Sequence, residues 1–94
     1  MTLNQFKDTL SNDSPPPDIS RPLQVMWHAA KDDWDGAHKL TQGTDDQTIA
    51  WTHAYLHRVE GDISNAKYWY SRAGRDMPNK TLEEEWESIV EALM

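Results

Sequence analysis

Residues 45–77 constrain the fold of this chain most strongly, because one glycine divides two helical patterns within them. Gly61 can adopt a left-handed backbone without steric penalty, so it suits the end of a helix. Asp62 follows directly and is a favourable N-cap for a second helix. This order of residues predicts two helices that fold back on each other at Gly61.

Small, aliphatic and aromatic side chains recur every three or four residues on both sides of Gly61, which is the spacing of one helical face. They are Ala50, Ala54, His57, Ile63, Ala66, Tyr70 and Ala73. Thr44 and Gln47 fit a capping box at the start of the first helix. Gly74, followed by Pro78, ends the second helix. We expect the two helices to approach closely through their alanines.

The order of residues in this hairpin is similar to that of a known repeat. The matching positions are Ala54, Gly61, Asp62, Ala66, Tyr70, Ala73 and Pro78. On these positions the stretch resembles a tetratricopeptide-type unit, a helix–turn–helix of about 34 residues. It departs from the family pattern before the turn, where His57 replaces a large aromatic residue and the early Trp has no equivalent. The resemblance implies an interaction scaffold rather than a reaction.

An older copy of the same hairpin is recognisable upstream. Residues 32–37 repeat the acid, apolar and alanine positions of residues 61–66 at an offset of 29, and His28 then corresponds to His57. We expect one helix over residues 20–32, and a second that Asp33 caps and Gly43 ends.

The two ends of the chain differ in character. Residues 1–12 have the apolar spacing of a short amphipathic helix, and three consecutive prolines make residues 13–18 a stiff, extended connector. Residues 81–94 open with a capping box of Thr81 and Glu84 and form an amphipathic helix rich in Glu, suited to cap the repeats.

These patterns predict an all-α protein of five or six helices, packed as two tetratricopeptide-like helical hairpins plus a C-terminal capping helix. Residues 1–19 are expected to form a short helix and a proline-rich connector, and residues 20–94 one helical domain. The expected core consists of Leu23, Trp27, Ala37, Leu40, Ala54, Leu56, Ile63, Ala66, Tyr70, Ala73, Trp86, Ile89 and Leu93.

Composition narrows the classes of function. The formal net charge is −7 over 94 residues, which argues against nucleic acid and membrane as partners. The absence of cysteine excludes disulfides and thiol chemistry. There is no signal-peptide pattern and no apolar run of about 18 residues. We therefore expect a cytoplasmic protein.

Histidines offer one candidate site. His53, His57 and Glu60 share a helix face, and two His at i and i+4 can bind Zn²⁺ or Ni²⁺ with a third ligand from elsewhere. The candidate ligands are His53, His57 and His28, and His38 could also contribute if the hairpins pack face to face. The metalloprotease motif lacks its glutamate. Alternatively, His57 is a structural residue in the hairpin seam.

Aromatic rings and arginines offer the other candidate. Tyr68, Trp69 and Tyr70 are consecutive, so about 100° separates each ring from the next and one helix face cannot bury all three. Arg58 and Arg72 could stack on such rings and bind a carboxylate or phosphate. Alternatively, the terminal helices cover the rings and the arginines pair with Glu60 or Asp62. The candidate contact residues are His53, His57, Arg58, Tyr68, Trp69 and Arg72.

Two hypotheses of function follow. The first is a non-enzymatic interaction module that binds a protein, a peptide or a second copy of itself through an aromatic, His and Arg surface, without a cofactor. The second is a site for a divalent transition metal or a small anion, with catalysis as one use, built on the histidines. The acids at helix starts are explained by capping.

Three segments carry a wider resemblance: LHRVEGDISNAKYWYSRAGR at residues 56–75, WDGAH at residues 34–38 and EEWESI at residues 84–89. Together they resemble a group of short, uncharacterised helical proteins of bacteria and fungi, over most of the chain from Leu23 onward. This resemblance implies a shared helical fold and brings no established activity with it.

Overall fold

The computed structural model describes residues 1–94 and contains six α-helices and no β-strand. The elements are α1 (Leu3–Asp8), the 3₁₀ turn η1 (Thr9–Ser11), α2 (Arg21–Ala30), α3 (Trp34–Lys39), α4 (Gln47–Val59), α5 (Ile63–Arg72) and α6 (Leu82–Leu93). The predicted all-α class is confirmed. None of these helices combines the length and apolar character needed to cross a membrane.

Side-chain caps fix where the helices begin. Thr81 and Glu84 form the expected capping box at the start of α6. The capping box expected at Thr44 and Gln47 is wrong, because α4 begins one residue after Asp46. The Asp46 carboxylate accepts from the amides of Thr48 and Ile49, and Thr44 accepts from the Asp46 amide instead. A carboxylate also interacts favourably with the positive end of the helix dipole.

The turns of the two hairpins are built alike. Gly61 has φ +83°, and Asp32, at the equivalent position, is the one residue other than glycine with positive φ, at 59°. After the left-handed residue, the amide of Asp62 donates to the carbonyl of His57 at 3.0 Å, and that of Asp33 donates to the carbonyl of His28 at 2.9 Å. Each aspartate then caps the next helix. The backbone therefore repeats at the offset of 29 residues.

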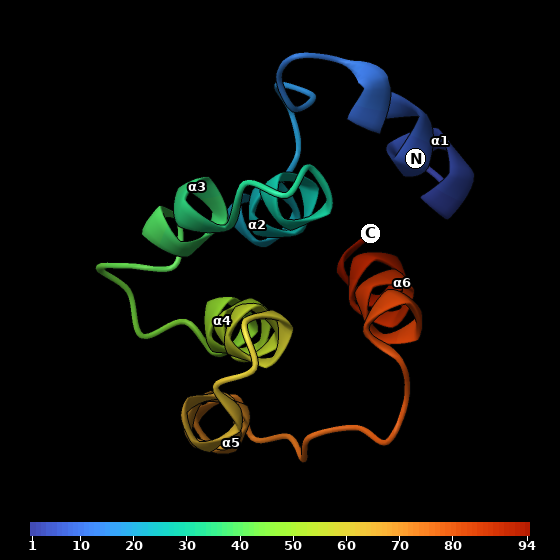
Figure 1. Ribbon diagram of the computed structural model, residues 1–94. Helices are drawn as coiled ribbons and strands as arrows, with labels where there is room; N and C mark the ends of the chain where they lie inside the picture. Colours follow the sequence, from blue (N-terminus) through green and yellow to red (C-terminus); the bar gives the residue numbers. More distant parts are fainter.

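The helices pack in layers, as Figure 1 shows. α2 pairs with α3, α4 pairs with α5, and the two hairpins contact each other through α2–α4 and α3–α4. α6 lies across α2 and α4 on the side away from α3 and α5, and α1 packs on α6. The indole of Trp86 on α6 donates to the carbonyl of Met26 on α2 at 2.9 Å, which links these two helices.

The main core lies between α2, α4, α6 and the N-terminal helix. Its buried members are Phe6, Leu23, Val25, Met26, Trp27, Ala37, Tyr55, Leu56, Trp86, Ile89 and Val90. A smaller cluster of Ala54, Ala66 and Tyr70 joins α4 to α5, as the alanine spacing predicts. Phe6 is fully buried with its ring 5.9 Å from that of Trp86, so the N-terminal segment shares the core of the main domain.

Four expected core residues are not buried. Leu40, Ala73 and Leu93 are partly exposed, and 41% of Ile63 is exposed. The expectation for Ile63 is wrong because no helix packs on the outer side of α5. The spacing of apolar residues along α5 correctly indicates one helix face. Burial of that face depends on whether another element covers it.

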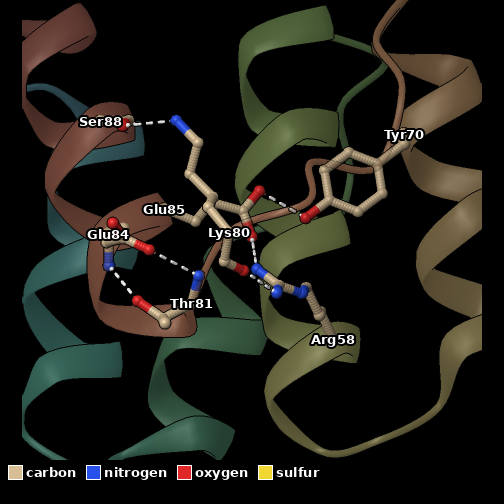
Figure 2. A network of polar contacts seen from close by, with 7 residues as sticks. All are labelled: Arg58, Tyr70, Lys80, Thr81, Glu84, Glu85 and Ser88. Carbon is tan, nitrogen blue, oxygen red and sulfur yellow. Dashed lines mark hydrogen bonds and ion pairs between the residues drawn. The ribbon is translucent and has the colours of Figure 1, made fainter.

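A buried carboxylate connects the last three helices (Figure 2). Glu85 of α6 accepts from the Arg58 guanidinium of α4 at 2.7 Å and from the Tyr70 hydroxyl of α5. Arg58 also donates to the carbonyl of Lys80 in the loop before α6. The expected pairing of Arg58 with Glu60 or Asp62 is therefore wrong. A side chain predicted to contact a partner is instead bonded inside the protein.

Replacement of Glu85 by Ala should lower the free energy of unfolding by about 3 kcal/mol, because it leaves the Arg58 charge without its buried partner. Glu87→Ala is the matched control, since Glu87 pairs with Lys7 at the surface. Glu87→Ala should lower the free energy of unfolding by less than about 1 kcal/mol. Urea unfolding of the two variants measures the difference. Equal losses would contradict an internal role for the Glu85 network.

Exchange of the residues at the two left-handed turns should have opposite effects. Asp32→Gly should raise the free energy of unfolding by about 0.5 kcal/mol, because glycine removes the steric cost of positive φ. Gly61→Asp should lower it by about 1 kcal/mol, although no atom lies within 4 Å of an added Cβ. Thermal unfolding of both variants tests this. A destabilised Asp32→Gly variant would contradict the equivalence of the turns.

Candidate functional site

Three histidines meet where the first hairpin packs on the second. His38 comes from α3, and His53 and His57 come from α4. One ring nitrogen of each lies within 4.8 Å of the others. His53 and His57 are buried, and His38 is partly exposed at the edge. Because the three rings come from two hairpins, this cluster depends on tertiary packing.

Helical spacing positions the rings. His53 and His57 are one helical turn apart on α4, and their ring centres are 4.8 Å apart. Trp34 and His38 have the same spacing on α3, where their rings stack at 4.6 Å with an interplanar angle of 12°. The indole of Trp34 also donates to the carbonyl of Leu56 at 2.7 Å, which ties α3 to α4. One tryptophan therefore sets both the orientation of His38 and the position of its helix.

A second tryptophan covers the cluster from α5. The ring of Trp69 stacks on that of His53 at 4.0 Å with an interplanar angle of 19°. Trp34 meets His57 edge-on at 5.8 Å. The histidines therefore lie between two indole rings, which exclude much of the surrounding water.

The polar atoms of the cluster are paired. Nε2 of His38 and Nε2 of His53 lie 3.1 Å apart. Two neutral imidazoles at this distance share one proton in an N–H···N hydrogen bond, or direct both lone pairs at a cation. Nδ1 of His57 donates to a Glu60 carboxylate oxygen at 2.6 Å. With a proton on Nδ1 for this hydrogen bond, Nε2 is the nitrogen that His57 would present to a metal ion.

Burial keeps two of the rings neutral. It lowers the pKa of His53 to about 4, with smaller contributions from the neighbouring His57 and His38. Burial is also the largest cause that lowers the pKa of His38, followed by His57. Neutral imidazole is the form that binds metal ions, so these shifts keep both side chains able to coordinate at pH 7.

His28 lies outside the cluster, although the sequence suggested it as the third ligand. Its Nδ1 is 3.1 Å from an Asp33 carboxylate oxygen within its own turn. His28 occupies the position in the first hairpin that His57 has in the second, and its ring is bonded at the turn of its own hairpin. His38 takes the third position because α3 packs against α4. The spacing of Trp34 and His38 in WDGAH was the available signal for this pair.

Some of the residues expected to contact a partner lie inside the protein, and others lie at its surface. His53 and His57 are inside the cluster, and Arg58 is bonded to Glu85. Tyr68 is 53% exposed, and its hydroxyl accepts from Arg72 at 3.1 Å. Arg72 also lies 5.8 Å from the ring of Trp69. Of the residues expected to contact a partner, only Tyr68, Trp69 and Arg72 form an aromatic and cationic surface, which adjoins the cluster through Trp69.

No protein-family model matches this chain, and neither a curated protein nor a solved structure shows significant similarity to it. The resemblance to tetratricopeptide units and to a group of short helical proteins therefore stays a prediction.

Acidification should destabilise the fold through His53. An unfolded histidine titrates near pH 6.5, whereas His53 in the folded chain titrates near pH 4, so the unfolded chain binds more protons between these values. The free energy of unfolding should fall by up to about 3 kcal/mol as the pH drops through this window.

Urea unfolding at a series of pH values measures this loss, and His53→Gln should show a smaller slope. An NMR titration of the imidazole rings shows whether His53 causes this loss. A His53 ring that titrates near pH 6.5 would contradict the described burial.

Proposed function

We propose that this protein binds a divalent transition metal ion, with Zn²⁺ as the reference ion, through His38, His53 and His57. The convergence of three imidazoles from two hairpins carries the proposal. Imidazole nitrogen is a common ligand of zinc, copper, nickel and iron in proteins. The site thus extends the metal hypothesis drawn from the sequence, with His38 in place of His28.

The spacing of the ligand atoms is compatible with a zinc centre. Nε2 of His38 and Nε2 of His53 are 3.1 Å apart. With Zn–N distances of about 2.05 Å, this separation corresponds to an N–Zn–N angle of about 100°, close to tetrahedral. The ideal separation is about 3.3 Å, and the ligand atom of His57 lies within 4.8 Å of the others, so a shift of its ring would complete the site.

The surroundings of the three rings also support a metal site. The hydrogen bond from His57 to Glu60 reproduces the carboxylate–histidine–metal pattern that orients ligands and raises their basicity. No fourth side chain joins this group, so a bound ion would keep one coordination position for water or another ligand. A zinc ion with an open position supplies Lewis acidity and lowers the pKa of bound water.

Metal binding to the native state should raise the melting temperature of chelator-treated protein. At a free Zn²⁺ concentration 100 times the Kd, the gain is about 2.7 kcal/mol, or about 14 °C for a domain of this size. His38→Gln should abolish this rise, measured against the melting temperature of the same variant without metal.

His28→Gln is the matched control, because it removes an imidazole from outside the cluster. It should keep the full rise. No shift in the wild type near 1 mM Zn²⁺, or an equal shift in the His38→Gln variant, would contradict the site.

A second candidate function is protein or peptide binding through Tyr68, Trp69 and Arg72. The observation in its favour is the exposure of Tyr68, since a large ring left at the surface beside a guanidinium is typical of binding sites. In the same proposal the outer face of α5, which ends the array of hairpins, is where a partner or a second copy would dock.

Binding at this surface should depend on Arg72. Peptides selected on the wild-type protein from a random phage-displayed library should lose at least about tenfold in affinity with Arg72→Ala. Thermal unfolding should stay unchanged, because Arg72 is exposed. Lys39→Ala, an exposed cation on α3, is the control. Affinities that do not respond to Arg72→Ala remove this residue from the contact surface.

A further inference from the structure

Arg75 differs from the other three arginines in its bonding. Arg21 donates to two backbone carbonyls, Arg58 to Glu85 and the Lys80 carbonyl, and Arg72 to Tyr68. The guanidinium of Arg75 forms no hydrogen bond or ion pair. It lies instead 3.5 Å from the ring centre of Trp51 on α4. Its planar group is therefore held by the indole while its N–H donors remain free.

The position of Arg75 is fixed by the end of α5. Gly74 takes the left-handed conformation with φ +72°, and the amide of Arg75 then donates to the carbonyl of Tyr70 at 2.9 Å. This is the Schellman arrangement, which sets the direction of the chain leaving a helix. Backbone and indole together orient the guanidinium before any ligand arrives, and such preorganisation lowers the entropic cost of binding.

Arg75 lines three neighbouring hollows between α4, α5, α6 and the loop that joins α5 to α6. Two have volumes of about 510 Å³ and the third about 220 Å³. Trp51 lines the second and third of them, and Ala92 does so from α6. A ligand in this groove would therefore meet free N–H donors next to an aromatic and apolar wall.

Cations predominate in this groove although the chain as a whole is acidic. Lys67 lines the first hollow and Lys80 the second, and neither has a carboxylate partner. Lys80 donates to the Ser88 hydroxyl at 3.0 Å (Figure 2). Asp76 lines both hollows without an ion pair, and the Glu85 charge is offset by Arg58. Three cations thus oppose one free carboxylate, which favours a dianion.

We propose that this groove binds a phosphate monoester dianion, with the phosphoryl oxygens on the Arg75 guanidinium and the ester group against Trp51. Arginine pairs with phosphate through two parallel hydrogen bonds. Lys67 in the first hollow and Lys80 in the second add positive charge. The site is separate from the histidine cluster. Trp51 and His53 are two residues apart on α4, so their side chains point about 200° apart.

Phenyl phosphate is the probe, titrated into the full chain at pH 7.5 by calorimetry, with ¹⁵N NMR of the Arg75 side chain as the local reporter. At this pH the ester is a dianion, since its second pKa is about 6. Phenyl sulfate has the same shape with one charge and should bind at least about tenfold more weakly. Benzoate, a planar monoanion, should also bind more weakly.

Arg75→Lys keeps the positive charge and removes the planar fork, so it should weaken phenyl phosphate binding by about tenfold. Arg75→Gln should weaken it further. Lys39→Gln removes a positive charge on α3 and should leave the affinity unchanged. Circular dichroism confirms that each variant is folded.

Three results would overturn the proposal. They are no binding at about 10 mM phenyl phosphate, equal weakening by Lys39→Gln and Arg75→Gln, and tighter binding of benzoate than of phenyl phosphate. The titration needs no metal ion, so its outcome is independent of the histidine site.

Discussion

The structure depends on the burial of α4 on every side. Residues 52–57 are buried without interruption, because α2, α3, α5 and α6 all contact this helix. Ala54 allows α5 to approach, and Tyr55 and Leu56 enter the main core. A helix enclosed in this way carries its polar side chains into the interior, where each needs a partner. His53 meets His38, His57 meets Glu60, and no buried side-chain polar atom is left without a hydrogen bond.

The burial of α4 also determines the protonation of its histidine side chains. A surface histidine is half protonated near pH 6.5, whereas burial among aromatic rings keeps His53 neutral down to about pH 4. Imidazole nitrogens lie close together between two indole rings, and imidazole is a ligand that suits zinc, copper and nickel. The same tryptophans hold α3 and α5 against α4. The packing that stabilises the hairpins is thus the packing that assembles the cluster.

Local sequence signals predicted the helices and their turns well. Gly61 with Asp62, the alanine and tyrosine spacing and the capping box of Thr81 each act within a few residues, so they can be read without a structure. The repeat at residues 32–37 was visible for the same reason. One miss is local, because Asp46 and not Thr44 caps α4. The others are long-range: the Arg58–Glu85 pair spans 27 residues, and His38 joins His53 only after α3 packs on α4. Periodicity identifies faces, but neighbouring elements decide which face is covered, as exposed Ile63 shows.

X-ray absorption spectroscopy of the zinc-loaded protein is the most direct measure of the central claim, because it reports the ligands of the ion itself. The account predicts three imidazole nitrogens at about 2.0 Å, with outer-shell scattering from their rings, and one further light-atom ligand. Because His38→Gln should no longer bind the ion at this site, the imidazole scattering should be lost in that variant. Six oxygen ligands without imidazole scattering, or an unchanged spectrum in the variant, would contradict a metal centre at this histidine cluster.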